Sequence, residues 1–281
     1  MDLAKPGDVI VIDAGGTNFR IGLVSLGPGR PKVQDLKISP MPGSQGPTTW
    51  DAFVDEVSEA VLPFTNRSRR VGLCFSYAAE ILPNRDGRVL RFSKQVQIEG
   101  SEGQELGRDL SAALAEKGVP GVTFSVLNDT VAALLGGVIA LRDEVFDGFI
   151  GLIYGTGVNT CYAESRERLA KLATTWTHDS MLVNMESARF DRVPRSEFDH
   201  RLDVQSVDPG LCLYEKMVSG RYQGTVVYQA LRQGAEDGLF SPGLTAFLRD
   251  LKELTSVQAD DFSTRPYGNG LLASACRTEA D

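Results

Sequence analysis

Two short turns rich in glycine, threonine and asparagine each follow a run of apolar residues. The turn residues are Gly15, Gly16, Thr17 and Asn18 in the first case, and Gly155, Thr156 and Gly157 in the second, about 140 residues later. Turns of this composition expose backbone N–H groups, which suit phosphate oxygens. The pattern favours a phosphate-binding turn at each place, with two ordinary β-hairpins as the alternative.

An acidic residue, Asp13, comes shortly before the first turn. A carboxylate beside a phosphate repels it unless a cation lies between the two groups. Mg²⁺ prefers oxygen ligands and keeps part of its water shell. Asp13 therefore predicts a magnesium ion, bound through water, next to the first turn.

A third polar group, made of Asn128, Asp129 and Thr130, follows the apolar run 122–127. In open α/β sheets, ligands bind beyond the carboxyl ends of the strands. A carboxylate there can accept the proton of an attacking hydroxyl group, so Asp129 is a candidate general base. The alternative is that this segment only caps the helix expected over 131–141.

The elements that must position these groups alternate between strands and helices. The expected strands are 9–12, 19–26, 33–38, 71–78, 88–92, 122–127, 148–154, 160–164 and 181–185. The expected helices begin near Trp50, carry Leu106, Leu110 and Leu114, cover 131–141, and begin at Asp208 and at Ser241. The strand–turn–strand unit of the first turn returns around the second turn, which indicates a duplicated α/β domain.

The composition is that of a soluble globular protein, with 281 residues, 42% apolar and 23% charged content, and a net charge of −8. This charge and the lack of a basic patch argue against a nucleic-acid partner. The longest apolar run, 131–141, is too short to span a bilayer, and the first residues show no signal-peptide pattern. Four well-separated cysteines fit a reducing cytoplasm rather than a disulfide framework or a zinc site. The sequence contains no P-loop, protein-kinase, serine-hydrolase or HExxH motif.

Seven motifs occur in the order and approximate spacing of the hexokinase family, from about residue 8 to about residue 232. They are DAGGTNFR, CFSYAAEI, RFSKQ, LNDTVAAL, YGTGVNTCY, NME and DPGLCLYEKMVSG. The chain thus resembles the actin-like sugar kinases, which have a duplicated ribonuclease-H-like α/β fold of two lobes with a cleft. The resemblance implies ATP-dependent phosphorylation of a hexose at its 6-hydroxyl group, with glucose as the favoured hexose, feeding glycolysis.

The same resemblance implies roles for individual residues. Asp129 matches the catalytic base, while Asp13 and the two turns match the magnesium and ATP phosphate positions. The positions that match hexose-binding residues are Ser76, Ser93, Lys94, Asn128, Asp129, Asn159, Glu186 and Glu215. Amides and carboxylates suit a hexose, because its hydroxyl groups both donate and accept hydrogen bonds.

The chain departs from the family pattern at three places within the motifs. Residues 77–78 read Tyr-Ala where the family often has Phe-Pro, and residues 93–95 read Ser-Lys-Gln where it has Thr-Lys-Gly. Residues 187–190 read Ser-Ala-Arg-Phe in place of Trp-Gly-Ala-Phe. The last change brings Arg189 next to a hexose-binding position, which bears on hexose specificity.

Family members continue beyond the position of Asp281, so we expect two lobes over 1–147 and 148–281, with the second incomplete. A shortened second lobe keeps open another interpretation, a non-catalytic hexose-binding or regulatory homologue. A third interpretation, an actin-like ATPase without a sugar, is disfavoured because the hexose-binding positions follow the family pattern. The expected partners are a hexose, ATP and Mg²⁺, with no membrane partner, and no oligomeric state is predicted.

Overall fold

The computed structural model describes residues 6–16, 18–27, 29–92, 96–141, 144–171, 179–278 and 281. The chain divides into two compact units. The first unit comprises Met1–Gly151 with Tyr162–Leu182, and the second comprises Leu152–Cys161 with Val183–Asp281. The lobe boundary expected after residue 147 stays a prediction.

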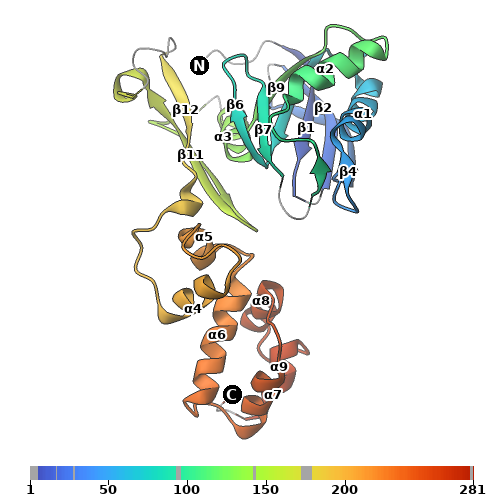
Figure 1. Cartoon of the computed structure of the whole chain (residues 1–281). Coiled ribbons are helices and arrows are strands. Elements are labelled where there is room, and N and C mark those ends of the chain that lie inside the picture. The colour runs from blue at the N-terminus through green and yellow to red at the C-terminus, as the bar shows by residue number, and fades with distance from the viewer. Residues whose placement is uncertain are drawn as a thin grey trace. The chain divides into compact units, whose positions relative to one another are not determined.

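A five-stranded sheet forms the centre of the first unit (Figure 1). Its strands, in spatial order, are β3 (Lys32–Pro40), β2 (Asn18–Leu26), β1 (Gly7–Ala14), β5 (Arg70–Phe75) and β9 (Thr123–Leu127). The pairs β1–β2 and β2–β3 are antiparallel, whereas β1–β5 and β5–β9 are parallel. The carboxyl ends of β1, β5 and β9 therefore meet at one edge of the sheet.

The strand expected over 71–78 is too long at its carboxyl end. β5 ends at Phe75, and the chain passes through Ser76 and Tyr77 into a separate hairpin of β6 (Ala78–Ile81) and β7 (Gly87–Arg91). Ala78 belongs to the hairpin, where it pairs with Arg91 instead of extending β5. Ser76 consequently lies just beyond the strand end, where a ligand-binding residue is expected.

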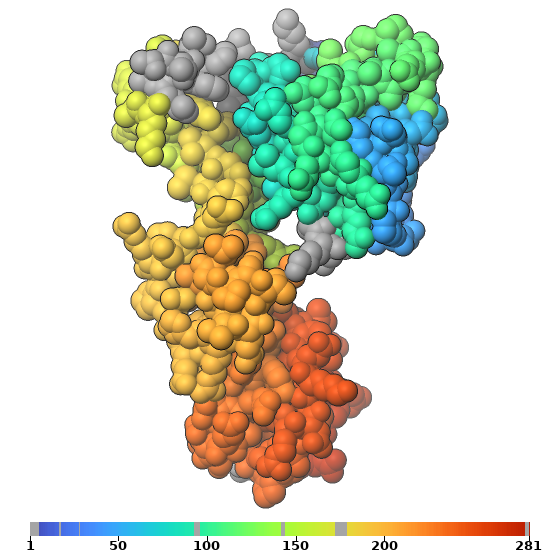
Figure 2. All heavy atoms as spheres, in the orientation of Figure 1, coloured from blue at the N-terminus to red at the C-terminus, as the bar shows by residue number. Residues whose placement is uncertain are grey.

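Three helices accompany the sheet: α1 (Trp50–Val61), α2 (Leu106–Glu116) and α3 (Asp129–Ala140). The expected start of α1 is confirmed, because the Thr49 side chain accepts a hydrogen bond from the Ala52 amide. α1 and α2 lie side by side on one face of the unit (Figure 2). Their apolar faces and the sheet share one core, and its fully buried members include Ile10, Leu23, Val57, Val61, Phe75, Leu106, Leu110 and Leu114.

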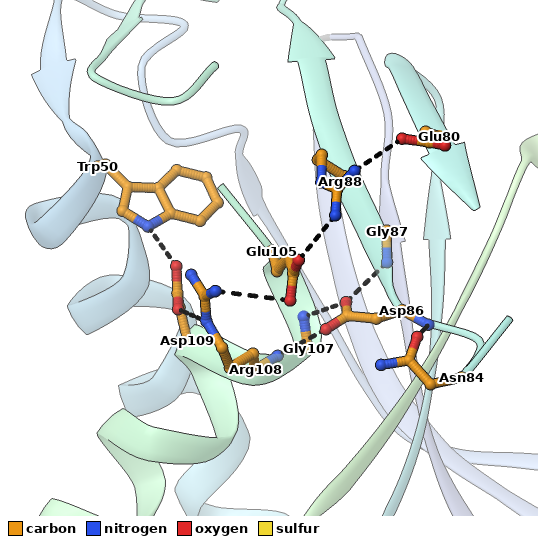
Figure 3. Close-up of polar contacts among 10 residues, drawn as sticks. All are labelled: Trp50, Glu80, Asn84, Asp86, Gly87, Arg88, Glu105, Gly107, Arg108 and Asp109. Carbon is orange, nitrogen blue, oxygen red and sulfur yellow. Dashed lines mark hydrogen bonds and ion pairs between the residues drawn. The ribbon is translucent and has the colours of Figure 1, made fainter. Parts of the chain in front are cut away.

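A buried carboxylate, Asp86, joins the β6–β7 hairpin to the start of α2 (Figure 3). Its Oδ1 accepts the amide hydrogens of Gly87 and Gly107, each at 2.6 Å, and its Oδ2 accepts that of Arg108 at 2.9 Å. A Cβ atom on Gly107 would lie 2.8 Å from Asp86 Oδ1, so glycine is needed there. α2 thus takes its cap from a residue 21 positions earlier, which fixes the hairpin against the core.

Charged side chains tie the same region together (Figure 3). Arg88 bridges Glu80 and Glu105 at 3.1 Å each, and the Trp50 indole donates to Asp109 at 2.9 Å. Two short strands, β4 (Thr48–Thr49) and β8 (Ile98–Glu99), pair beside α1. The contacts of Arg88 hold the β6–β7 hairpin against the start of α2. The second strand of this hairpin, β7, precedes residues 93–95 in the sequence.

A second sheet contains β10 (Ile150–Tyr154), β11 (Val158–Ser165) and β12 (Ser180–Asn184), in that spatial order. β11 and β12 are antiparallel, because the Met185 amide donates to the Thr160 carbonyl and the Arg166 amide donates to the Asp179 carbonyl. This order repeats that of β1, β2 and β3 in the first sheet. The predicted echo of the first strand–turn–strand unit is therefore present.

After β12, the second unit is helical (Figure 1). Its helices are α4 (Glu197–Gln205), α5 (Leu213–Val218), α6 (Gln223–Glu236), α7 (Pro242–Asp250), α8 (Ser256–Thr264) and α9 (Leu271–Ala275). The buried residues Tyr228, Leu244, Leu248, Leu254 and Leu272 form its core. Among the described residues, no helix is both long enough and apolar enough to cross a membrane.

The helix start expected at Asp208 is wrong, although a helix is present a few residues later. Residues 208–212 form turns, and α5 begins only at Leu213. Gly210 and Cys212 adopt left-handed backbone conformations, with φ of 80° and 51°, which no α-helix can contain. The helix expected at Ser241 is confirmed, and the Ser241 side chain caps it by accepting from the Leu244 amide.

Candidate active site

Two of the candidate carboxylates lie at the carboxyl edge of the first sheet. Asp13 on β1 stands opposite Cys74 on β5, and Cys74 stands opposite Leu127 on β9. Asn128 and Asp129 follow Leu127 directly. The strand register thus brings the predicted magnesium ligand and the predicted base to the same edge, on either side of β5.

Cys74 reports how close these carboxylates lie. Burial and the nearby charges of Asp13 and Asp129 raise the pKa of its thiol from 9.0 to about 12. The cysteine lies inside a motif that indicated the family, but no sequence pattern predicts its position between the two acids.

The Cys74 thiol is expected to resist alkylation in the folded protein. A pKa of about 12 reduces the thiolate fraction at pH 8 by about 10³-fold, and the rate should rise with pH until the thiol ionises near pH 12. A pulse of iodoacetamide followed by peptide mass mapping measures this rate. Labelling of Cys74 at pH 8 as fast as in the urea-unfolded chain would contradict the assignment.

Asp129 occupies the first turn of α3. Its Oδ1 accepts from the Thr130 amide at 2.7 Å and from the Thr130 hydroxyl at 3.2 Å. The side chain of Asn128 is the N-cap, accepting from the same amide at 2.9 Å. The capping interpretation is therefore confirmed for Asn128, and it leaves the Asp129 carboxylate partly exposed at the strand end, as a general base requires.

The first turn is held by its own backbone and by one distant side chain. The Gly15 amide donates to the Asn18 carbonyl at 3.1 Å, and the Tyr77 hydroxyl donates to the Gly15 carbonyl at 2.7 Å. Gly16 is exposed, while Thr17 lies outside the described residues. The exposed backbone of this turn is suited to phosphate oxygens.

Asp13 already has a cationic neighbour, since Arg20 Nη1 lies 2.7 Å from Asp13 Oδ2. Both side chains are about 40% exposed, at 42% for Arg20 and 40% for Asp13, so the pair is accessible to a ligand. Within the described residues, no group of three or more His, Cys, Asp or Glu side chains could hold a metal. A magnesium ion at Asp13 fits only if water and phosphate supply most of its ligands, which is its usual preference.

One further hexose-binding candidate of the first unit, Ser76, lies near the same edge. Ser76 is exposed beyond the end of β5, and its amide donates to the Ala14 carbonyl at 3.2 Å. Ser93 and Lys94 lie outside the described residues. The family position of Ser76 is thus supported by its location, whereas the other two stay predictions.

The second turn is held at both ends by α5 and the residues after it. The Gly155 amide donates to the Gly157 carbonyl at 2.9 Å, and the Gly220 amide donates to the Gly155 carbonyl at 2.7 Å. Glu215 Oε2 accepts from the Val158 amide at 3.1 Å. Glu215 therefore contacts the backbone that leaves the predicted phosphate turn, a contact that its predicted role as a hexose ligand does not include.

A chain of hydrogen bonds joins two other hexose-binding candidates. Asn159 Nδ2 donates to Asn184 Oδ1 at 2.7 Å, and Asn184 Nδ2 donates to Glu186 Oε1 at 2.8 Å. Asn159 Oδ1 in turn accepts from the Ser187 amide at 3.3 Å. Asn184 was missed as a site residue, although it is the first letter of the NME motif.

Glu186 itself has a left-handed backbone, with φ of 51°. Residues other than glycine, asparagine and aspartate seldom adopt this conformation, and strained residues of this kind cluster at functional sites. It turns the chain sharply from β12 into the single helical turn of residues 187–189. The exposed carboxylate is thereby directed back toward Asn184.

A buried lysine next to Glu215 anchors α5. Lys216 Nζ lies 2.7 Å from Asp203 Oδ1 and 3.2 Å from Asp208 Oδ1, and it donates to the Asp208 carbonyl at 2.7 Å. The Gly210 amide completes the cluster by donating to Asp203. This buried group explains both the irregular segment before α5 and the fixed position of Glu215.

Two family models described as hexokinase match the chain, one over residues 4–139 and the other over residues 149–274. Together they cover most of its length. The chain belongs to the hexokinase family. Among the relatives of this hexokinase-family chain, Hexokinase-1 of Nicotiana tabacum is 30% identical over 253 residues, which are 84% of this chain and 50% of the relative. The chain thus spans about half the length of the curated relatives that it matches.

Solved structures agree with the family at the level of the fold. A hexokinase from Schistosoma mansoni complexed with glucose has a TM-score of 0.67 and 22% identity, with 98% of this chain and 70% of that chain covered. A ROK family glucokinase from Streptomyces griseus in complex with glucose and AMPPNP has a TM-score of 0.53 and 18% identity, with 95% and 73% covered. The predicted α/β fold of the actin-like sugar kinases is confirmed for this hexokinase-family chain.

Proposed function

We propose that this protein transfers the γ-phosphoryl group of ATP to the 6-hydroxyl group of a hexose, with glucose as the favoured substrate. The observation that carries the proposal is the register of β1, β5 and β9, which places Asp13 and Asp129 at one sheet edge beside a phosphate-type turn. The family membership and the relatives named hexokinase support the same reaction. A related glucokinase solved with glucose and AMPPNP supports both substrates.

Asp129 is the proposed general base. It would accept the proton of the 6-hydroxyl group as that oxygen attacks phosphorus, and the strand-end position keeps its carboxylate accessible. Phosphoryl transfer otherwise depends on positioning and on charge stabilisation. The proposed phosphate contacts are the backbone and side chains of Gly15, Gly16, Thr17, Asn18, Gly155, Thr156 and Gly157. Asp13 would hold Mg²⁺ through water, and the ion would supply positive charge to the phosphates when bound.

Hexose recognition is assigned to amide, hydroxyl and carboxylate groups. In the second unit, the hydrogen-bonded chain of Asn159, Asn184 and Glu186 presents both donors and acceptors, and Glu215 adds a carboxylate. In the first unit, the proposed hexose ligands are Ser76, Ser93, Lys94, Asn128 and Asp129. By the same proposal the product feeds glycolysis and the protein works in the cytoplasm.

The proposed acceptor atom can be tested with 6-deoxyglucose, which lacks only the 6-hydroxyl group. It is expected to inhibit glucose phosphorylation competitively, with an inhibition constant within about 10-fold of the glucose KM, because one hydrogen bond is lost. It should itself accept no phosphate. Phosphorylation of 6-deoxyglucose would show that another hydroxyl group is the acceptor. The absence of any inhibition would contradict the proposed hexose-binding site.

A further inference from the structure

Tyr77 lies outside the first turn, the proposed phosphate turn, and makes a side-chain hydrogen bond to it. Its hydroxyl donates to the Gly15 carbonyl at 2.7 Å, across 62 positions of sequence. The residue is 8% exposed. Burial raises the pKa of the phenol to about 12, so the hydroxyl stays a donor throughout the physiological range.

The position of the Tyr77 ring is fixed independently of this hydrogen bond. Its centroid lies 5.2 Å from that of Phe75 and 4.7 Å from that of Phe92. Phe75 ends β5, and Phe92 follows β7. The ring is thus held by packing, so the hydroxyl can transmit that rigidity to the turn.

Two backbone hydrogen bonds also hold the part of this stretch that the structure describes. The adjacent Ser76 amide holds the Ala14 carbonyl at 3.2 Å, and the Gly15 amide closes the turn onto Asn18. The Gly15 carbonyl therefore marks the point where the fixed strand passes into the exposed turn. A glycine here has many conformations available, so an external hydrogen bond has a large effect on its order.

We propose that Tyr77 is a positioning residue, whose hydroxyl holds the first turn in its phosphate-binding conformation and links it to the hexose-binding segment at Ser76. This inference rests on the proposed function, since the turn is assigned there to ATP. Residue 77 is also a place where the chain departs from its family's phenylalanine.

The variant Tyr77→Phe removes the hydroxyl and keeps the ring. Its KM for MgATP is expected to rise about 5- to 10-fold, the equivalent of one net hydrogen bond, while kcat and the KM for glucose change less than about 2-fold. In hydrogen–deuterium exchange, amides of the peptide over residues 14–19 are expected to exchange about 10-fold faster. Amide exchange elsewhere in the first unit is expected to stay unchanged.

A matched control is Tyr228→Phe. Tyr228 is also 8% exposed and also donates its hydroxyl to a backbone carbonyl, that of Leu251, in the helical core of the second unit. This variant should lose similar stability without changing the KM for MgATP or the exchange of residues 14–19. A merely structural role for Tyr77 would make the two variants behave alike.

Unchanged exchange of residues 14–19 in Tyr77→Phe would overturn the proposal, whatever the kinetics. Faster exchange with an unchanged KM for MgATP would also overturn it, because the turn would then be tethered without consequence for the nucleotide. A folded wild-type protein that transfers no phosphate would refute the proposed function instead. In that case the dissociation constant of MgAMPPNP is measured for the wild type and for Tyr77→Phe in place of the KM. Equal dissociation constants would refute the tether independently of the proposed function.

Discussion

Replacing Asp129 with asparagine is expected to lower kcat for hexose phosphorylation by about 10²- to 10⁴-fold, the usual contribution of a positioned general base. The hexose dissociation constant should change by less than about 3-fold. Asparagine keeps an oxygen that can accept from the Thr130 amide and hydroxyl, as Asp129 Oδ1 does. The first turn of α3 is therefore preserved while the proton acceptor is lost.

The kinetics are measured with a coupled assay and the hexose affinity by calorimetry. Asp51→Asn is the matched control, because Asp51 is also an aspartate in the first turn of a helix of the first unit, but at an exposed position of α1. It should leave kcat within about 2-fold of the wild type. If the Asp129→Asn variant keeps more than a tenth of the wild-type kcat, Asp129 is not the general base.

Replacing Lys216 with methionine is expected to destabilise the second unit by about 3 kcal/mol. The Lys216 side chain is 2% exposed and the Asp203 side chain 12%, so methionine leaves a buried carboxylate without its nearest cation. The segment between α4 and α5 should then loosen, and with it Glu215. We therefore also expect the KM for hexose to rise.

The control for this variant is Lys117→Met. Lys117 likewise has two carboxylate partners, Asp55 and Glu59, each at 2.6 Å, but those side chains are more than half exposed. Exposed pairs contribute about 0–1 kcal/mol, so this variant should unfold in urea nearly as the wild type does. Equal stability of both lysine variants would contradict the buried anchor.

The pH dependence of the anchor has a definite sign. Burial alone would raise the pKa of Asp203, but hydrogen bonds from Lys216 and the Gly210 amide outweigh it and lower the pKa below 3.8. Burial would lower the pKa of Lys216, but its bonds to Asp203 and Asp208 raise it above 10.5. The contribution of Asp203 is thus lost as the pH falls below 3.8, and that of Lys216 as it rises above 10.5. The difference between wild type and Lys216→Met in urea unfolding should be largest between these limits.

The first unit could be predicted well because its signals are local. β-branched runs predicted the strands, two glycines predicted the turn after β1, and apolar residues at helical spacing predicted a helix that begins near Trp50. The parallel order of β1, β5 and β9 follows from α/β chain topology, and it sufficed to bring Asp13 and Asp129 together. What the sequence could not show is that Cys74 lies between the two acids, because that depends on register.

The second unit was predicted less well because its decisive contacts are long-range or unusual. A run opening with Asp208 and Pro209 is typical of a helix start, yet the Asp203–Lys216 pair and two left-handed residues override it. α4 did have a readable signal, the capping box of Ser196 and Asp199. The link from Asn184 to Asn159 is a hydrogen bond between β12 and β11, which no local pattern encodes.

The Asp86 cap of α2 shows the same limit in the first unit. Leucine spacing predicted the helix, but the side chain that caps it lies in the β6–β7 turn. Sequence patterns identify caps that stand directly before a helix and miss those supplied by another element. The close approach of Gly107 to Asp86 is likewise visible only in three dimensions.

The most direct test of the central claim is to incubate this 281-residue chain with MgATP and glucose and to follow the phosphorus NMR spectrum. Glucose 6-phosphate has its own resonance, so transfer to sugar is distinguished from hydrolysis to inorganic phosphate. We expect glucose 6-phosphate to accumulate with ADP in equal amounts, at a turnover on the order of 1 to 10³ per second. A folded chain that yields no sugar phosphate, or only inorganic phosphate whether or not glucose is present, would contradict the account.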